Sequence, residues 1–224
     1  MKLSEQTVNL LKNFSTINSG LFFTKGNTIR TMSPQKNVLC EAVVEDTFPQ
    51  DFAIYDLNNF LSVLSLSKDS DIEFTDTSAV IKCLAGRSKI NYRFTEKSMI
   101  TVPPDKNLTL PSVDVKFTLT EDDLAWIMKT SSILSSPNVA VSSDGDTASI
   151  WCFDEKDSSQ PTNSVDVGLP ADKKYRLIFK TDNLKLIPGS YDVEISSKGI
   201  AHFKNTTKNI QYWIAIESTS SFGG

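Results

Sequence analysis

The sequence predicts an α+β chain made of two copies of one domain, each with two helices packed on antiparallel sheets. Short β-rich segments separated by turn residues fill most of the chain, and amphipathic helical stretches interrupt them at a few places. The order helix, strands, short helix, three strands occurs twice. A proline-bearing stretch without helical period separates the two copies.

Length and composition fit two ordinary domains. The chain has 224 residues, of which 39% are hydrophobic and 22% charged, enough for two domains of about 110 residues. Residues 1–112 carry 12 basic and 12 acidic side chains, and residues 113–224 carry 11 and 15. Neither half is basic, so a tight binder that neutralises DNA phosphates is disfavoured.

The first helix is expected to begin after Ser4, whose hydroxyl can cap the free backbone N–H groups. Its apolar stripe is Val8, Leu10, Leu11 and Phe14. We expect Gly20 to end the helix segment in the left-handed conformation.

Strands are expected at residues 21–24, 27–32, 37–44 and 51–55. A second helix then starts after Asp56. Its predicted buried stripe is Leu57, Phe60, Leu61 and Leu64, and its polar, uncharged outer face is Asn58, Asn59, Ser62 and Ser65. Three strands at 71–75, 79–84 and 89–94 close the copy.

The predicted organisation is a domain over residues 1–100, an extended connector over 101–115 and a second domain over 116–224. The second copy reproduces the first helix start at a constant offset of 116, where Leu119, Thr120, Leu124 and Ile127 match Leu3, Ser4, Val8 and Leu11. Strands are expected at 138–143, 148–153, 164–169 and 175–179, with a hairpin at Asp144-Gly145. A short or irregular helix is expected at 181–187. The closing strands at 192–195, 199–202 and 209–214 correspond to those of the first copy.

The sequence offers no catalytic site, so an enzyme is not expected. His202 is the one histidine and has no nucleophile signature beside it. Asp144-Gly145-Asp146 lacks the remaining ligands of a calcium loop. Cys40, Cys83 and Cys152 have apolar neighbours, as buried thiols do. We expect no metal and no cofactor, and no apolar run is long enough to cross a bilayer.

Several segments resemble the DNA polymerase sliding clamps, the processivity factors, of T-even-type bacteriophages. They are the MKLS start, LLKNFSTINSG at 10–20, AIYDLNNFLSVLSL at 53–66, EDDLAWIMK at 121–129 and LIPGSYDVEI at 186–195. The resemblance implies a homotrimeric closed ring that encircles duplex DNA in the host bacterial cytoplasm. It also implies a DNA polymerase and a clamp loader as partners, and a part in transcription regulation.

The same resemblance implies which residues face DNA and which bind protein partners. The helices would line the hole, and the DNA-facing residues would be Lys2, Lys12, Asn58, Asn59, Ser62, Lys129 and Lys185. Two positions depart from the phage pattern, because Glu5 and Ser132 stand where basic residues are expected. An apolar partner-binding pocket near the connector would use Val102, Pro103, Leu108 and Leu110. Packing of the connector on its own domain explains those four residues equally well.

A second interpretation stays open on the sequence alone. The chain could be a duplicated β-rich structural or interaction protein of a virus, with no role on DNA. A hydrolase is the weakest alternative, because the sequence has a single histidine and contains no catalytic motif.

Overall fold

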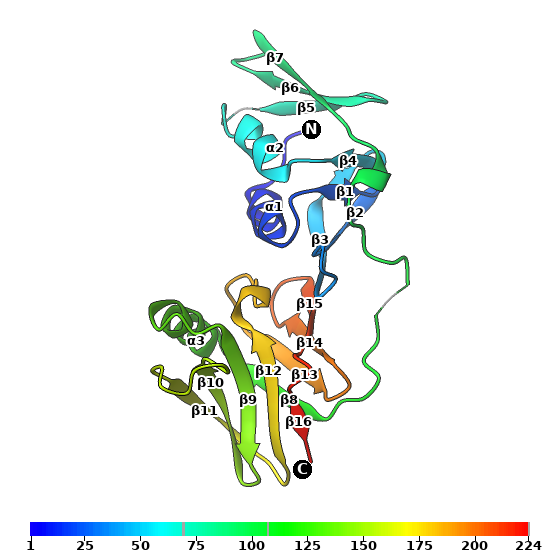
Figure 1. The fold of residues 1–224 in the computed structure, drawn as a ribbon. Coiled ribbons are helices and arrows are strands. Elements are labelled where there is room, and N and C mark those ends of the chain that lie inside the picture. The colour runs from blue at the N-terminus through cyan, green and yellow to red at the C-terminus, as the bar shows by residue number, and fades with distance from the viewer. Residues whose placement is uncertain (69, 107, 224) are drawn as a thin grey trace. The chain divides into compact units, whose positions relative to one another are not determined.

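The computed structural model describes residues 1–68, 70–106 and 108–223. It divides into two compact units, Met1–Asp105 and Lys106–Gly224, and Figure 1 shows their ribbons.

In the first unit, two helices accompany two antiparallel sheets (Figure 1). The strand order is β4-β1-β2-β3 in one sheet and β5-β6-β7 in the other. The elements are α1 (Glu5–Ile17), β1 (Leu21–Phe23), β2 (Gly26–Met32), β3 (Val38–Phe48), β4 (Phe52–Ile54), α2 (Leu57–Leu64), β5 (Asp71–Phe74), β6 (Ser78–Cys83), β7 (Ser88–Arg93) and the 3₁₀ turn η1 (Lys97–Met99).

The second unit repeats this plan. Its elements are β8 (Val115–Leu119), α3 (Glu121–Ile133), β9 (Asn138–Asp144), β10 (Thr147–Phe153), β11 (Asn163–Pro170), β12 (Lys174–Lys180), the 3₁₀ turn η2 (Thr181–Asn183), β13 (Tyr191–Ser196), β14 (Ile200–Asn205), β15 (Ile210–Ala215) and β16 (Ser221–Phe222). The order β12-β9-β10-β11 matches β4-β1-β2-β3, and β13-β14-β15 matches β5-β6-β7. The predicted duplication is therefore present in the strand order.

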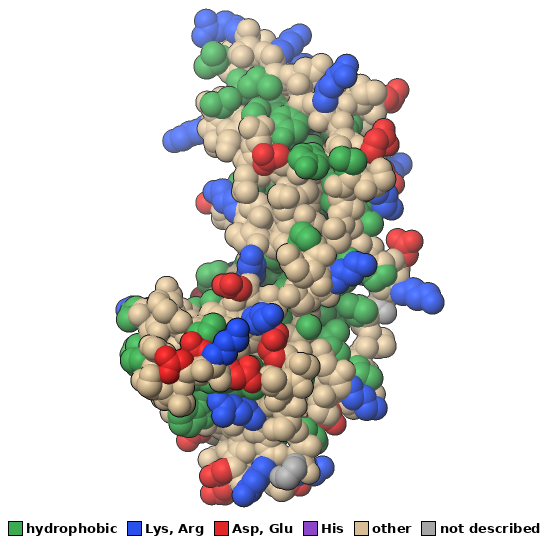
Figure 2. Space-filling view, in the orientation of Figure 1, with side chains coloured by type: hydrophobic (Ala, Val, Ile, Leu, Met, Phe, Trp, Pro, Cys, Tyr) green, Lys and Arg blue, Asp and Glu red, His purple; other side chains and the backbone are tan. Residues whose placement is uncertain are grey.

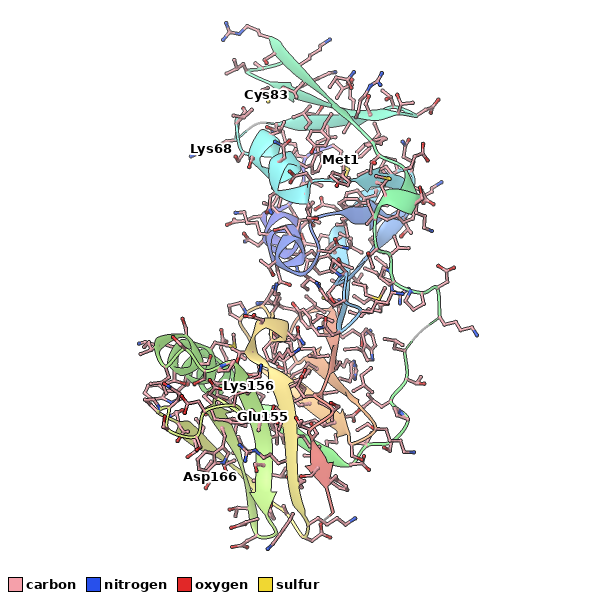
Figure 3. All side chains as sticks on the ribbon, viewed as in Figure 1. Met1, Lys68, Cys83, Glu155, Lys156 and Asp166 are labelled. Atoms are coloured by element: carbon pink, nitrogen blue, oxygen red, sulfur yellow. The ribbon has the colours of Figure 1, made fainter. Side chains whose placement is uncertain are left out.

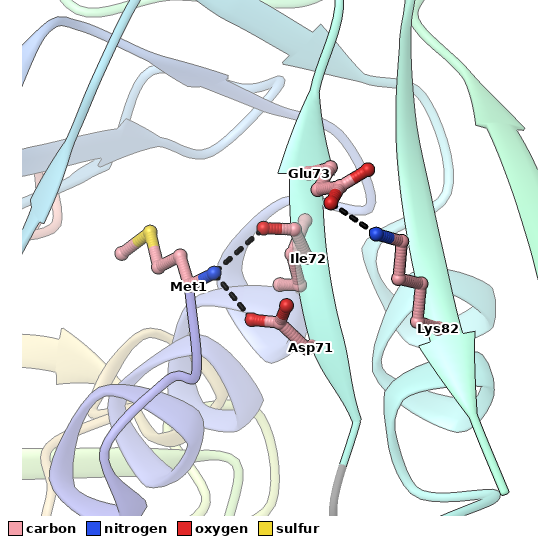
Figure 4. Close-up of polar contacts among 5 residues, drawn as sticks. All are labelled: Met1, Asp71, Ile72, Glu73 and Lys82. Carbon is pink, nitrogen blue, oxygen red and sulfur yellow. Dashed lines mark hydrogen bonds and ion pairs between the residues drawn. The ribbon is translucent and has the colours of Figure 1, made fainter. Parts of the chain in front are cut away.

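A single residue pair in the first unit replaces a whole strand of the second. In the second unit β8 pairs with β13 and sets Phe117 opposite Val193. In the first unit, Met1 and Ile72 exchange two backbone hydrogen bonds of 2.8 Å at the equivalent place. The Met1 ammonium also donates to Asp71 at 2.5 Å, which lowers the pKa of that carboxyl. Figure 4 shows the two bonds that the Met1 ammonium donates.

Beside this pair, Glu73 of β5 and Lys82 of β6 form a cross-strand ion pair (Figure 4). Opposite charges on paired strands stabilise the pairing modestly. The edge of β5 is therefore supported on one side by Met1 and on the other by β6.

The start of α1 is fixed by the predicted cap. Ser4 Oγ accepts from the backbone N–H of Thr7 at 3.1 Å, and Ser4 donates through N and Oγ to Asp46 of β3 at 2.9 and 2.8 Å. Because Asp46 lies on a strand, these bonds tie the helix start to the sheet. The predicted apolar stripe is buried at Leu10, Leu11 and Phe14, whereas Val8 at its edge is half-buried and the polar Thr7 is buried. The buried residues are Thr7, Leu10, Leu11, Phe14 and Ile17, a regular three-and-four spacing that passes beside Val8.

The prediction that Gly20 adopts the left-handed conformation is wrong. Its φ is not positive, and Asn18 caps the helix in an extended conformation. A Cβ at Gly20 would lie 3.3 Å from the carbonyl oxygens of Ile54 and Tyr55 and 3.1 Å from Ile100. Glycine is needed here for close chain approach.

The second helix agrees with its prediction except at Leu64. Asp56 accepts from the backbone N–H of Asn59 at 2.9 Å and caps α2. Leu57, Phe60 and Leu61 are buried, whereas Leu64 in the last turn is half-buried.

In the second unit, the helix expected at 181–187 is the single turn η2. The backbone after it is held by side chains instead. The hydroxyl of Tyr191 donates to the carbonyl of Ile187 at 2.7 Å, and the hydroxyl of Tyr212 accepts from the Ile187 N–H at 3.3 Å. Gly189 then adopts φ +146°, where a Cβ would collide with Asn205 at 2.6 Å. The second unit therefore has one α-helix within its described residues.

Thr120 caps α3 at the position that matches Ser4 of the first copy. Thr120 Oγ1 accepts from the backbone N–H of Asp123 at 3.1 Å and donates to its carboxylate at 2.6 Å. This fixes the start of the helix as Ser4 does for α1.

Replacing Ser4 by alanine should lower the free energy of unfolding by about 1 kcal/mol, because the first turn of α1 loses its cap and its link to Asp46. Urea unfolding followed by circular dichroism measures this. Ser15→Ala is the matched control, since the Ser15 hydroxyl bonds only to the carbonyl of Lys12 in its own helix. Equal effects of the two substitutions would contradict the anchoring role of Ser4.

Candidate DNA-facing surface and connector

The predicted DNA-facing residues of the first unit lie on two neighbouring helices. α1 and α2 pack side by side (Figure 1). Lys12 on α1 and Asn58, Asn59 and Ser62 on α2 are all exposed. In the second unit, α3 packs on β10 and β11 and exposes Lys129.

Hydroxyl groups on these helices are bonded within their own helix. Ser62 donates to the carbonyl of Asn58 at 2.8 Å, Thr16 to that of Asn13 at 2.7 Å and Thr130 to that of Trp126 at 2.8 Å. A hydroxyl whose hydrogen is already donated offers little to a phosphate oxygen. The exposed helix faces therefore present few strong hydrogen-bond donors.

The charges of the helices are equally sparse. α1 carries Glu5 and Lys12, α2 carries no charge, and α3 carries Lys129 against three acidic residues in its first turn. Lys2 is exposed ahead of α1, and Lys185 is half-buried in the segment after η2. Neither of these two lysines lies on a helix. Such a surface binds phosphates weakly, because few counterions are released.

The first half of the connector is fastened to the first unit. The side-chain amide of Asn18, which is buried, donates to the carbonyls of Met32 at 2.9 Å and Thr101 at 3.0 Å. Arg30 of β2 donates to the carbonyl of Pro104 at 2.9 Å. Residues 101–104 therefore follow a fixed path over this unit.

The second half is fastened to the second unit through Asp114. Its carboxylate accepts from the backbone N–H and hydroxyl of Ser197, both at 2.7 Å, and from the hydroxyl of Ser112 at 2.9 Å. These bonds, with those from Ser197 the strongest, lower the pKa of Asp114. No pattern in the sequence predicts Asn18, Arg30 or Asp114 as connector contacts, because each depends on at least one partner distant in the chain.

The four predicted partner-binding residues are divided between the two units. Val102 and Pro103 belong to the first unit, and Leu108 and Leu110 to the second. All four are half-buried.

The histidine and the cysteines, the other side chains with reactive groups, lie in packed or hydrogen-bonded surroundings. His202 lies 2.9 Å from the Gln211 side-chain oxygen and stacks on Trp213 with ring centroids 4.9 Å apart. The three cysteines are buried, as predicted, and burial raises the pKa of Cys152. Across the residues that the structure describes, no three His, Cys, Asp or Glu side chains gather as metal ligands. No helix in that part of the chain is long and apolar enough to span a membrane.

A duplicated pair of sheet domains with exposed, weakly charged helices defines a clamp-type protein. Two family profiles match the chain: "DNA polymerase processivity factor" over residues 2–102 and "gp45 sliding clamp, C terminal" over residues 116–218. The chain belongs to the sliding-clamp family, the processivity factors of phage DNA polymerases.

Relatives of similar length support this assignment. The sliding clamp of Vibrio phage KVP40 is 31% identical, over 97% of this chain and 100% of that protein. The sliding clamp of Enterobacteria phage T4 is also 31% identical, over 99% of each chain. Among solved structures, proliferating cellular nuclear antigen from Entamoeba histolytica superposes with a TM-score of 0.64 at 12% identity, over 94% of each chain. At that identity the likeness concerns the fold.

The lowered pKa of Asp114 gives a pH-dependent contribution to stability. The carboxylate stabilises the fold fully above the usual aspartate pKa of about 4, and the contribution is lost as the pH falls through the lower folded value. Asp114→Ala should therefore cost about 1 kcal/mol at pH 7, and its difference from the unaltered protein should shrink below pH ~4.

Thermal unfolding over a pH series checks this prediction. Asp105→Ala, at an exposed acid in the connector, is the control and should change stability little. A cost of Asp114→Ala that stays constant down to pH ~2 would contradict the role of the carboxylate.

Proposed function

We propose that this clamp acts as a homotrimeric ring that encircles duplex DNA and tethers the replicative polymerase once a clamp loader has placed it. In this proposal the protein catalyses no reaction and works in the host bacterial cytoplasm, where it also takes part in transcription regulation. The observation that carries the proposal is the helix surface, whose hydroxyls are bonded internally and whose charges are few. A sliding ring needs such a surface, because strong phosphate contacts would hold it in place.

Ring closure requires strand edges that another subunit can pair with, and among the terminal strands we select β7 and β11 for their charge. β7 is one of the two terminal strands of its sheet in the first unit, and β11 is one of the two terminal strands of its sheet in the second. Unpaired edges are templates for pairing with another chain. β7 exposes Lys89 and Arg93, and β11 exposes Asp166, so the two edges have opposite charge. We propose that β7 of one subunit pairs with β11 of the next.

The DNA-facing set in this proposal is Lys2, Lys12, Asn58, Asn59, Ser62, Lys129 and Lys185. The exposed positions of Lys12, Asn58, Asn59, Ser62 and Lys129 on helices support it. For the polymerase and clamp-loader contacts, we propose Val102, Pro103, Leu108 and Leu110, within a connector spanning 101–115 between domains at 1–100 and 116–224. Their partial exposure leaves apolar surface available to a partner. The alternative of a structural protein without a DNA role is not favoured by the family to which the chain belongs.

The edge pairing predicts the effect of a charge reversal on assembly. At micromolar concentration the unaltered protein should sediment near 74 kDa, three times the chain mass of 24.8 kDa. Asp166→Lys should shift the population toward the single chain, because two like-charged edges repel, and adding Lys89→Glu should partly restore the trimer. Asp172→Lys, at an exposed turn residue, is the control. A single-chain mass for the unaltered protein at high concentration and low salt would refute the ring.

The helix placement predicts a functional effect of two lysines. Lys12→Glu combined with Lys129→Glu should reduce processive synthesis on primed circular DNA several-fold, because two of the few cations facing the duplex become anions. Sedimentation should still show the trimer. Lys25→Glu with Lys204→Glu, both exposed outside the helices, is the matched control. Unchanged synthesis with the first pair would mean that these helices do not face DNA.

A further inference from the structure

A cavity of about 740 Å³ lies wholly within the second unit, away from the connector residues. Its floor is one face of the strands β9, β10 and β12, and it is bounded by the loop after β10 and by the adjoining ends of β9 and β10 at Asp144 and Thr147. Cys152 contacts Ile127 of α3 on the other face of this sheet. Trp151 and Phe153, its neighbours on the strand, therefore point away from the helix and into the cavity.

The floor is aromatic and already accommodates a cation. Trp151 is 38% exposed, and its indole N–H donates to Ser149 at 2.9 Å. The polar edge of the ring is therefore satisfied within the strand, and the exposed part of the ring is available for apolar and cation–π contact. Nearby, the guanidinium of Arg176 lies 4.2 Å from the ring centroid of Phe153. The small residues Ser142 and Ser149 line the cavity beside these large side chains.

The rim is formed by carboxylates that lack a cationic partner. Asp144, Asp154, Glu155 and Asp157 all line the cavity. Three of them accept hydrogen bonds within their own turns, and bonds from Gln160 and Ser159 lower the pKa of Asp157. Within the described ranges, none of the four forms an ion pair.

The figures show the setting of this rim. Figure 3 shows Glu155 and Lys156 on the loop in front of the sheet. Figure 2 shows red acidic side chains on this face of the second unit, among blue basic and green hydrophobic ones. Lys156 belongs to the loop but does not line the cavity. The lining itself therefore holds four carboxylates and one arginine.

We propose that this cavity binds an extended basic segment of a protein partner, with a lysine or arginine side chain over Trp151 and its charge among the rim carboxylates. Aromatic faces attract cations and accept their aliphatic stems. The volume is typical of ligand sites, about 300–1,000 Å³. An acidic segment or a nucleic acid would meet uncompensated negative charge here. The proposal does not depend on ring assembly or on DNA.

The test uses two capped peptides and the full chain. The probes are Gly-Arg-Leu-Arg-Leu-Gly and a second peptide with glutamate in place of arginine. Calorimetry measures the affinity of each peptide, and the ¹⁵N-indole NMR signals of the three tryptophans locate where it binds. The arginine peptide should bind and shift the signal of Trp151, identified with Trp151→Phe, while those of Trp126 and Trp213 stay in place. The glutamate peptide and a DNA oligonucleotide should not bind at this site.

Matched variants separate charge at the rim from charge elsewhere. Asp144→Asn with Glu155→Gln keeps the shape of the rim and removes two charges. This double variant should bind the arginine peptide with about tenfold lower affinity. Glu45→Gln with Asp76→Asn removes two exposed charges from the first unit and should leave affinity unchanged. The proposal is overturned if neither peptide binds at millimolar concentration, if the glutamate peptide or the oligonucleotide binds here equally well, or if the rim variant binds like the unaltered protein.

Discussion

The contact of Phe52 with four other phenylalanines holds the first unit together behind its helices. Its ring stacks on Phe23 at 4.4 Å and lies 5.8, 5.1 and 5.0 Å from Phe48, Phe74 and Phe94. Phe23, Phe48 and Phe52 belong to one sheet, whereas Phe74 belongs to the other and Phe94 follows its last strand. Removing a buried phenylalanine side chain typically costs about 3–5 kcal/mol. The positions of α1 and α2 depend on this junction, because both sheets must keep their places for the helices to lie side by side.

The helices are held firmly at their starts, whereas their exposed faces offer few groups that bind phosphate strongly. Ser4, Asp56 and Thr120 fix the helix starts, so the exposed faces have a defined orientation. On those faces, Ser62, Thr16 and Thr130 donate back to the helix backbone. A duplex beside such a surface meets scattered lysines and neutral amides. Retention on DNA would then follow from ring closure, and binding to an open-ended duplex would be weak.

Local sequence signals account for most of the fold and part of the candidate site. Caps at Ser4 and Thr120 and alternating strands were recognisable because their causes lie within a few residues. The conformation of Gly20 could not be predicted, because it depends on the distant Ile100. The path after η2 could not be predicted either, because it depends on hydrogen bonds to Tyr191 and Tyr212. The sequence also does not predict the connector contacts of Asn18 and Asp114 or the carboxylate-rimmed cavity, because the fold brings together residues that are separated in the chain.

Retention on DNA of two topologies tests the central claim most directly. The clamp would be loaded onto nicked circular DNA with its clamp loader, the circle would then be cut once, and the protein remaining on the DNA would be measured before and after the cut. A topological tether predicts persistence on the closed circle and rapid loss from the cut molecule, with little effect of moderate salt on the closed form. Equal retention on circular and linear DNA, declining together as salt rises, would contradict the account and indicate a binder held by phosphate contacts.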